Sequence, residues 1–210
     1  MSEKIKSPER LVFFSDAVVA IALTLLVLPL TDFASSILSG SSSFAEVEKH
    51  QSLIWTFLLS FLVIGRYWLV HHQTFEQVKA YSRPLMLVNM AWLLTIVFLP
   101  FPTELVASTS SHDRFTLILY IGTLFVSSLL LGIMLVIIRD DPTVLREPGA
   151  ISYRWEFDSL SVTVTLAICL ATVAIFPAVS YYILLLNMVQ PWFVRAWFWL
   201  RGRSASKVDA

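Results

Sequence analysis

The chain has 210 residues, of which 57% are hydrophobic and only 14% are charged, and its 15 basic and 15 acidic side chains leave a formal net charge of zero. This composition excludes a soluble domain and indicates a polytopic membrane protein. The zero net charge gives no reason to expect a nucleic-acid partner, and the single cysteine, Cys169, excludes an intrachain disulfide.

The first apolar stretch covers residues 10–30 and is long enough to cross a bilayer, which takes about 20 helical residues. Two polar side chains, Ser15 and Asp16, interrupt it. A carboxylate inside a membrane helix is costly and usually faces protein or water rather than lipid. We therefore expect Asp16 to anchor this helix to a neighbour.

The same helix presents a second, aliphatic face. Steps of about 100° per residue place four side chains on one stripe, roughly opposite Asp16. The stripe consists of Ile21, Thr24, Leu25 and Leu28. If copies of the chain gather around an axis, this stripe would line a narrow hydrophobic constriction. The alternative is that it faces lipid or packs inside the subunit.

Five further apolar segments follow, so the sequence predicts an all-α membrane protein with six transmembrane helices in one domain, residues 1–210. These segments lie at about residues 52–74, 85–101, 115–138, 159–175 and 178–198. The remaining stretches, including 31–50, 103–114 and 139–158, are expected to be polar or charged loops. Two prolines in Leu-Pro-Phe-Pro (99–102) are expected to end the third helix.

The basic residues predict the orientation of these helices. Twelve of the 15 Lys and Arg residues fall on one side of the membrane in this arrangement, whereas Lys49 and Arg114 fall on the other and Arg66 lies within a helix. Basic loops stay in the cytoplasm. Both termini are therefore expected to be cytoplasmic, which requires an even number of spans.

Several polar side chains fall at a similar depth below the cytoplasmic end of the first three helices. They are Ser15, Asp16, Arg66, His71 and Asn89. Satisfied polar groups can lock helices together inside a membrane, whereas a lone charge in lipid is costly. A helix-packing network is the structural interpretation. A proton relay or a cation site is the functional alternative, and it requires Asp16 or His71 to face water.

The sequence gives little support for metal binding, for catalysis or for a carbonyl filter. The adjacent His71 and His72 would point about 100° apart on a helix, and no cysteine or second histidine cluster completes a set of metal ligands. No nucleophile elbow and no TVGYG-type filter occurs. We expect no metal site, no cofactor, no catalytic residue and no enzymatic activity.

Three motifs in the first half of the chain resemble signatures of one family. R-x-x-x-F-S-D occupies residues 10–16, W-x-x-H-x-x-x-F occupies residues 68–75, and L-V-N with a later F-L-P-F occupies residues 87–101. Together they resemble the transmembrane protein 175 family of potassium channels, which are lysosomal in animals and also occur in bacteria. The second half of the chain resembles the family only in its layout.

The resemblance implies a single-repeat subunit of the bacterial type that forms a homotetramer. The first helix would line the pore, with Ile21 at the selectivity position, Thr24 three residues later, and Leu25 and Leu28 extending the constriction. The polar side chains and their neighbours would hold the helices together rather than touch the ion. This structural network consists of Arg10, Phe14, Ser15, Asp16, Trp68, His71 and Asn89.

The sequence thus predicts a multi-pass channel of the inner (plasma) membrane that conducts K⁺ passively. A hydrophobic ring gates by dewetting and makes a permeating ion shed water. The expected partners are K⁺ ions, lipid and further copies of the chain, with no nucleic acid. Two alternatives stay open: a proton-coupled secondary transporter that uses Asp16 and His71, and a non-conducting membrane scaffold.

Overall fold

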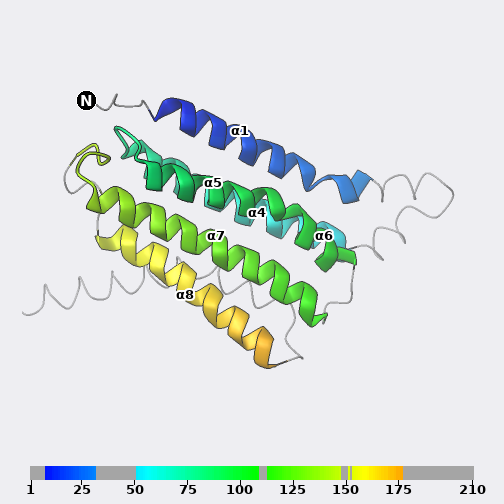
Figure 1. Cartoon of the computed structure of the whole chain (residues 1–210). Coiled ribbons are helices and arrows are strands. Elements are labelled where there is room, and N and C mark those ends of the chain that lie inside the picture. The colour runs from blue at the N-terminus through cyan, green and yellow to red at the C-terminus, as the bar shows by residue number, and fades with distance from the viewer. Residues whose placement is uncertain (1–7, 32–50, 109–112, 148–150, 152, 177–210) are drawn as a thin grey trace, which may run out of the picture.

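The computed structural model describes residues 8–31, 51–108, 113–147, 151 and 153–176, and these residues are helical throughout their apolar segments (Figure 1). The helices are α1 (Glu9–Leu25), α4 (Gln51–Glu76), α5 (Arg83–Phe98), α6 (Pro100–Ser108), α7 (Arg114–Asp140) and α8 (Tyr153–Ile175). Within these ranges five helical stretches are long and apolar enough to cross a membrane. They are Glu9–Thr31, Leu53–Glu76, Arg83–Ser108, Arg114–Asp140 and Trp155–Ile175.

The helices lie roughly side by side, with α1 at one edge of the bundle and α8 at the opposite edge (Figure 1). Helix α7 packs against α5 on one side and α8 on the other. Half of its apolar stretch is buried, against 22% of that of α1 or α8. Helix α1 contacts α4 and α5 through one face only, so its other face is free of contacts with the described part of the subunit.

The third span differs from the sequence prediction at its end. Residues 103–108, expected to lie in a loop, are helical, because α6 continues the direction of α5 after Leu99. Pro100 and Pro102 fall in the first turn of α6. Proline is tolerated there, since the first N–H groups of a helix have no intrahelical partner. The two prolines therefore start a helix segment instead of ending the span.

Helix α8 also begins earlier than predicted. The sequence prediction assigned residues 153–158 to a charged loop, but they form the first turns of α8. Acidic side chains such as Glu156 are favourable at a helix N-terminus. Its carboxylate also accepts a hydrogen bond from Arg139 at the end of α7, at 3.0 Å. The sixth predicted span, 178–198, lies outside the described residues, so six spans per subunit remains a prediction while the all-helical class is confirmed.

Two loops at one end of the bundle are joined by backbone hydrogen bonds. The Lys79 N–H donates to the Val144 carbonyl at 2.9 Å, and the Arg146 N–H donates to the Gln77 carbonyl at 2.7 Å. The pair forms an isolated antiparallel bridge around the buried Val78. The α4–α5 and α7–α8 connections are thereby fastened to each other.

At the opposite end of α7, Asp113 caps the helix. Its carboxylate accepts hydrogen bonds from the hydroxyl and the backbone N–H of Thr116, the second at 3.0 Å. Both bonds stabilise the charged carboxylate, the hydroxyl bond more than the backbone bond, and they hold the pKa of Asp113 below its ordinary value. A carboxylate cap of this kind satisfies helix N–H groups that would otherwise have no partner.

Replacing Asp113 with alanine is expected to lower the melting temperature of the purified protein at neutral pH. Because folding lowers this pKa, the cap contributes its full stabilisation above the unfolded pKa of about 3.9 and loses it as the pH falls through the lower folded value. Asp113→Asn keeps a capping oxygen without that titration. Thermal unfolding at pH 7 and pH 3 checks this, and an Asp113→Ala variant that melts like the wild type would contradict it.

Candidate functional site

Helix α1 has one buried and one exposed face. The buried face carries Leu11, Ser15, Val19, Ala22 and Leu26, at three- and four-residue spacing. The predicted stripe lies on the exposed side: Ile21 is 59% exposed, Leu25 38% and Leu28 53%, and Thr24 is exposed as well. None of the four side chains is buried inside the subunit. They are therefore available to lipid or to another copy of the chain.

Thr24 has a particular hydrogen-bonding state. Its hydroxyl donates to the backbone carbonyl of Ile21 at 2.7 Å. The hydroxyl proton is thus used within the helix, and the oxygen keeps its lone pairs as an acceptor. An exposed acceptor on an otherwise aliphatic stripe is suited to contact a partly dehydrated cation.

The buried face of α1 is held by a chain of hydrogen bonds that joins three helices. The Asn89 amide of α5 donates to Ser15 Oγ at 2.9 Å, and Ser15 donates to the Leu11 carbonyl at 2.9 Å. His71 Nε2 of α4 lies 2.7 Å from Asn89 Oδ1. Since that oxygen can only accept, the bond requires the proton on Nε2. The structure thus brings Ser15, His71 and Asn89 into one buried chain.

His71 is enclosed by aromatic rings. It stacks on Trp92, with ring centroids 4.3 Å apart and planes at 6°, and on Phe75 at 4.3 Å. The histidine side chain has no exposed surface. A ring without exposed surface is suited to positioning helices rather than to exchanging protons with water.

Asp16 belongs to a second, more exposed group. The Trp68 indole N–H donates to Asp16 Oδ1 at 2.8 Å. Asp16 Oδ2 lies 4.0 Å from His72 Nδ1, and His72 Nε2 lies 3.9 Å from Glu76 Oε1. The side chains of Asp16 and His72 are 29% and 40% exposed. The histidine beside Asp16 is therefore His72, whereas the sequence analysis paired Asp16 with His71.

The sequence did contain a signal for His72. Residues four apart on a helix share a face, so His72 follows Trp68 on the face that meets Asp16. The two rings lie 5.4 Å apart between centroids. Once Trp68 is assigned to the network, this spacing selects His72 rather than His71 as the second neighbour of Asp16.

Three predicted members do not join either hydrogen-bonded group. Arg10 and Phe14 are exposed on α1, and Phe14 has 52% of its surface free. Arg66 was expected at the same depth as His71, but it lines a separate pocket between α4, α7 and α8. Among the described residues no group of three or more His, Cys, Asp or Glu side chains is placed to hold a metal ion.

Replacing Asp16 with alanine is expected to lower the yield of assembled protein, because the Trp68 N–H loses its acceptor and α1 loses a tie to α4. Size-exclusion profiles after purification measure this. His72→Gln is the control. The His72 Nδ1 atom lies 4.0 Å from the Asp16 carboxylate, beyond hydrogen-bonding distance, so this substitution should change assembly little. Normal assembly of Asp16→Ala with altered ion selectivity would place Asp16 in the ion pathway.

The spans, the all-helical bundle and the one-sided packing of α1 define a multi-pass membrane protein. Residues 10–100 match the family model described as endosomal/lysosomal potassium channel TMEM175. This range includes α4, α5, all of α1 except Glu9, and every residue of the two hydrogen-bonded groups. The resemblance to the transmembrane protein 175 family, indicated by the three motifs, is confirmed by this match and by similar proteins.

Two relatives illustrate the similarity. The chain is 36% identical over 106 residues to a protein of Streptomyces collinus named a potassium channel, which covers 50% of each sequence. It is 23% identical over 213 residues to a Danio rerio protein named endosomal/lysosomal proton channel TMEM175, which covers 95% of this chain and 39% of that protein. The matches thus span half or less of the length of these relatives.

A solved structure has the same fold. The crystal structure of a lysosomal potassium-selective channel TMEM175 homolog from Chamaesiphon minutus superposes with a TM-score of 0.63 over 89% of this chain and 97% of that chain, at 22% identity. The bundle described above therefore corresponds to a known channel fold. The family described by the matching model is one of ion channels rather than enzymes.

Proposed function

We propose that the chain assembles as a homotetramer in the inner (plasma) membrane, with both termini cytoplasmic, and conducts K⁺ passively through a pore lined by α1. The observation that carries this proposal is the division of α1 into two faces. Its polar face is tied to α4 and α5 by Ser15 and Asp16, while its aliphatic stripe stays exposed. A helix at the edge of the bundle can bring such a stripe to a symmetry axis (Figure 1).

In this arrangement Ile21 from each subunit forms the narrowest ring, and Leu25 and Leu28 extend it. Such a ring excludes ions by dewetting and admits those that shed water most cheaply. K⁺ loses its water at lower cost than Na⁺, so the ring favours K⁺ modestly. The Thr24 oxygens offer acceptors to the partly dehydrated ion. The sequence contains no TVGYG-type filter motif, so we expect weaker selectivity than in channels that use one.

A second candidate function is proton movement through the site on α1. The partly exposed group of Asp16, His72 and Glu76 favours it, and relatives named proton channels share the family. The Asp16 carboxylate and the His72 imidazole lie within 4.0 Å of each other, and proton movement through them requires that water reaches this group. In this alternative His72, not His71, is the partner of Asp16.

Cation flux into proteoliposomes distinguishes these functions. Vesicles loaded with K⁺ or Na⁺ are diluted into the opposite salt, and a pH-sensitive dye reports proton counterflow. Potassium flux well above sodium flux supports the channel. Flux that requires a pH gradient and is lost in Asp16→Asn supports the proton-linked alternative. If an intact oligomer shows no flux of either kind, both functions are overturned and the non-conducting scaffold is the remaining alternative.

A further inference from the structure

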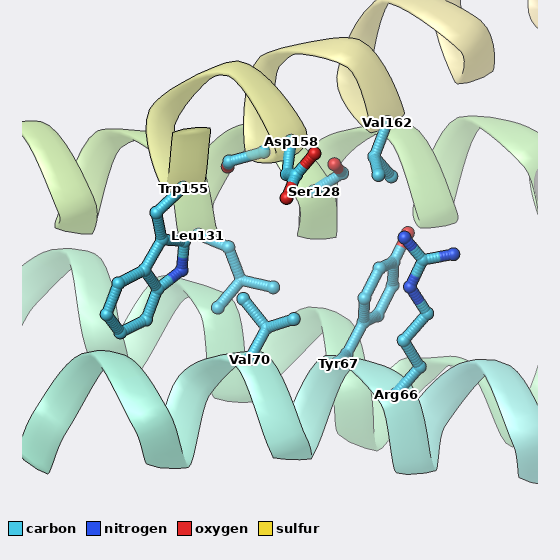
Figure 2. A pocket seen from close by; sticks show the side chains of 9 residues that line it. Arg66, Tyr67, Val70, Ser128, Leu131, Trp155, Asp158 and Val162 are labelled. Carbon is cyan, nitrogen blue, oxygen red and sulfur yellow. The ribbon is translucent and has the colours of Figure 1, made fainter. Parts of the chain in front are cut away.

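A second polar site lies on the far side of the bundle from α1. A partly open pocket of about 70 Å³ is lined by α4, α7 and α8. Figure 2 shows Arg66 rising from α4 and Asp158 descending from α8, with Trp155 at the end opposite Arg66. None of the motif residues on α1 contributes to it. The cavity is well above the roughly 15 Å³ that one water needs.

The two charged side chains of this pocket come from different helices. Arg66 lies inside the span Leu53–Glu76, and Asp158 belongs to the span Trp155–Ile175. The two side chains attract each other electrostatically. Charges within membrane spans are costly and usually mark a function or a packing lock. A packing lock would be expected to leave no space beside the two charges, whereas here both side chains border an open volume.

The depth of the pocket matches the edge of the membrane. Trp155 lies in the first turn of α8, and Asp158 lies about one turn further along the helix. Tryptophan is enriched at the boundary between headgroups and hydrocarbon. Asp158 is exposed and stands at the rim, while Arg66 is partly buried. A lipid next to α8 therefore meets the carboxylate first and the guanidinium deeper in.

The rest of the lining suits an amphiphile. Val70, Leu131 and Val162 provide apolar walls. Ser128 and Ser159 add hydroxyl groups, and the Ser128 hydroxyl lies 2.8 Å from that of Thr163. The pocket thus offers one cation, one anion and hydroxyls beside apolar surface. Its chemistry fits a small zwitterion carried on a hydrocarbon tail better than an anion or a cation alone.

We propose that this pocket binds the headgroup of phosphatidylethanolamine, with the phosphate at Arg66 and the primary ammonium at Asp158. Arginine binds phosphate oxygens with paired N–H donors. A primary ammonium donates three hydrogen bonds and can therefore bind Asp158 closely. A quaternary choline headgroup has no such donor, and a glycerol headgroup leaves the carboxylate facing an anionic lipid. The site does not depend on ion conduction by the chain.

Native mass spectrometry of the full-length protein, titrated with phosphatidylethanolamine, phosphatidylcholine or phosphatidylglycerol, tests the assignment. The first lipid should be retained about tenfold more than the other two, as a charge-assisted hydrogen bond allows. Asp158→Asn should abolish that preference, and Arg66→Gln should weaken retention of all three. Equal retention of the three lipids by the wild type, or an unchanged preference in Asp158→Asn, overturns the proposal.

Two controls sharpen the test. Arg139→Gln and Asp140→Asn remove the same charge types from an ion pair of 2.6 Å at the end of α7, outside the pocket, and should leave the lipid preference unchanged. Asp158 is exposed, so its variant keeps the test decisive if Arg66→Gln fails to fold. Displacement of the lipid by soluble phosphoethanolamine at the same concentration would assign the pocket to a free solute and overturn the lipid site.

Discussion

Replacing Ile21 with asparagine is expected to raise sodium permeability relative to potassium by about tenfold, which corresponds to about 1.4 kcal/mol between the two ions. The physical reason is that an amide side chain wets the ring and lets an ion pass with more of its water. Ile21 is 59% exposed on the free face of α1, so the change should not disturb packing inside the subunit. Flux assays with paired K⁺ and Na⁺ gradients measure the ratio.

The chain offers a closely matched control. Ile168 is 60% exposed, nearly the same as Ile21, but belongs to α8, which lies at the opposite edge of the bundle from α1 (Figure 1). Ile168→Asn introduces the same polar group at the same exposure and should leave the ion ratio unchanged. If the Ile21 variant conducts with wild-type selectivity, Ile21 does not form the constriction. If both variants change selectivity alike, the effect arises from a general disturbance of the bundle.

Replacing Asn89 with leucine is expected to destabilise the protein by about 1–3 kcal/mol, the typical cost of leaving a buried polar group without a partner. His71 loses the acceptor for its Nε2 proton and has no exposed surface through which water could replace it. Ser15 loses a donor but still bonds to the Leu11 carbonyl. Most of the cost therefore comes from His71. Thermal unfolding of the purified protein measures the change.

Thr172→Val serves as the control for this prediction. Among the described residues its hydroxyl bonds only to the Ile168 carbonyl of its own helix, at 2.8 Å in an exposed position, so its loss should change stability little. An Asn89→Leu variant as stable as the wild type would show that the three-helix chain makes no net contribution. In that case the helices would be held by apolar packing alone.

Much of the arrangement of side chains in the candidate site could be predicted from helical periodicity and from depth in the membrane. Periodicity of 3.6 residues placed the stripe of Ile21 and Leu25 on one face, because the helix is regular there. Depth correctly grouped Ser15 with His71 and Asn89, since helices that run side by side bring equal depths together. It failed for Arg66, which lies five residues from His71 and so about 140° around the same helix. Depth along an axis does not fix the direction around it.

The same limit explains why the sequence predicted His71, and not His72, as the histidine beside Asp16. Adjacent residues point about 100° apart, and the sequence does not say which of two neighbouring helices each one faces. The prediction of the helix ends was wrong for another reason. Proline and charged residues were interpreted as loop formers, although both are favourable in the first turn of a helix. Pro100 and Glu156 occupy such positions.

The bridge between the two loops bears on how the subunit can move. Because the connections around Val78 and Leu145 are fastened by backbone bonds, the hairpins α4–α5 and α7–α8 cannot hinge independently at that end. The two hairpins are therefore expected to move together as one rigid unit. Among the described residues, the hydrogen bonds that tie helix α1 to this unit are made by side chains. In the proposed channel, the pore width would therefore change most easily by rotation or sliding of α1 against this rigid unit.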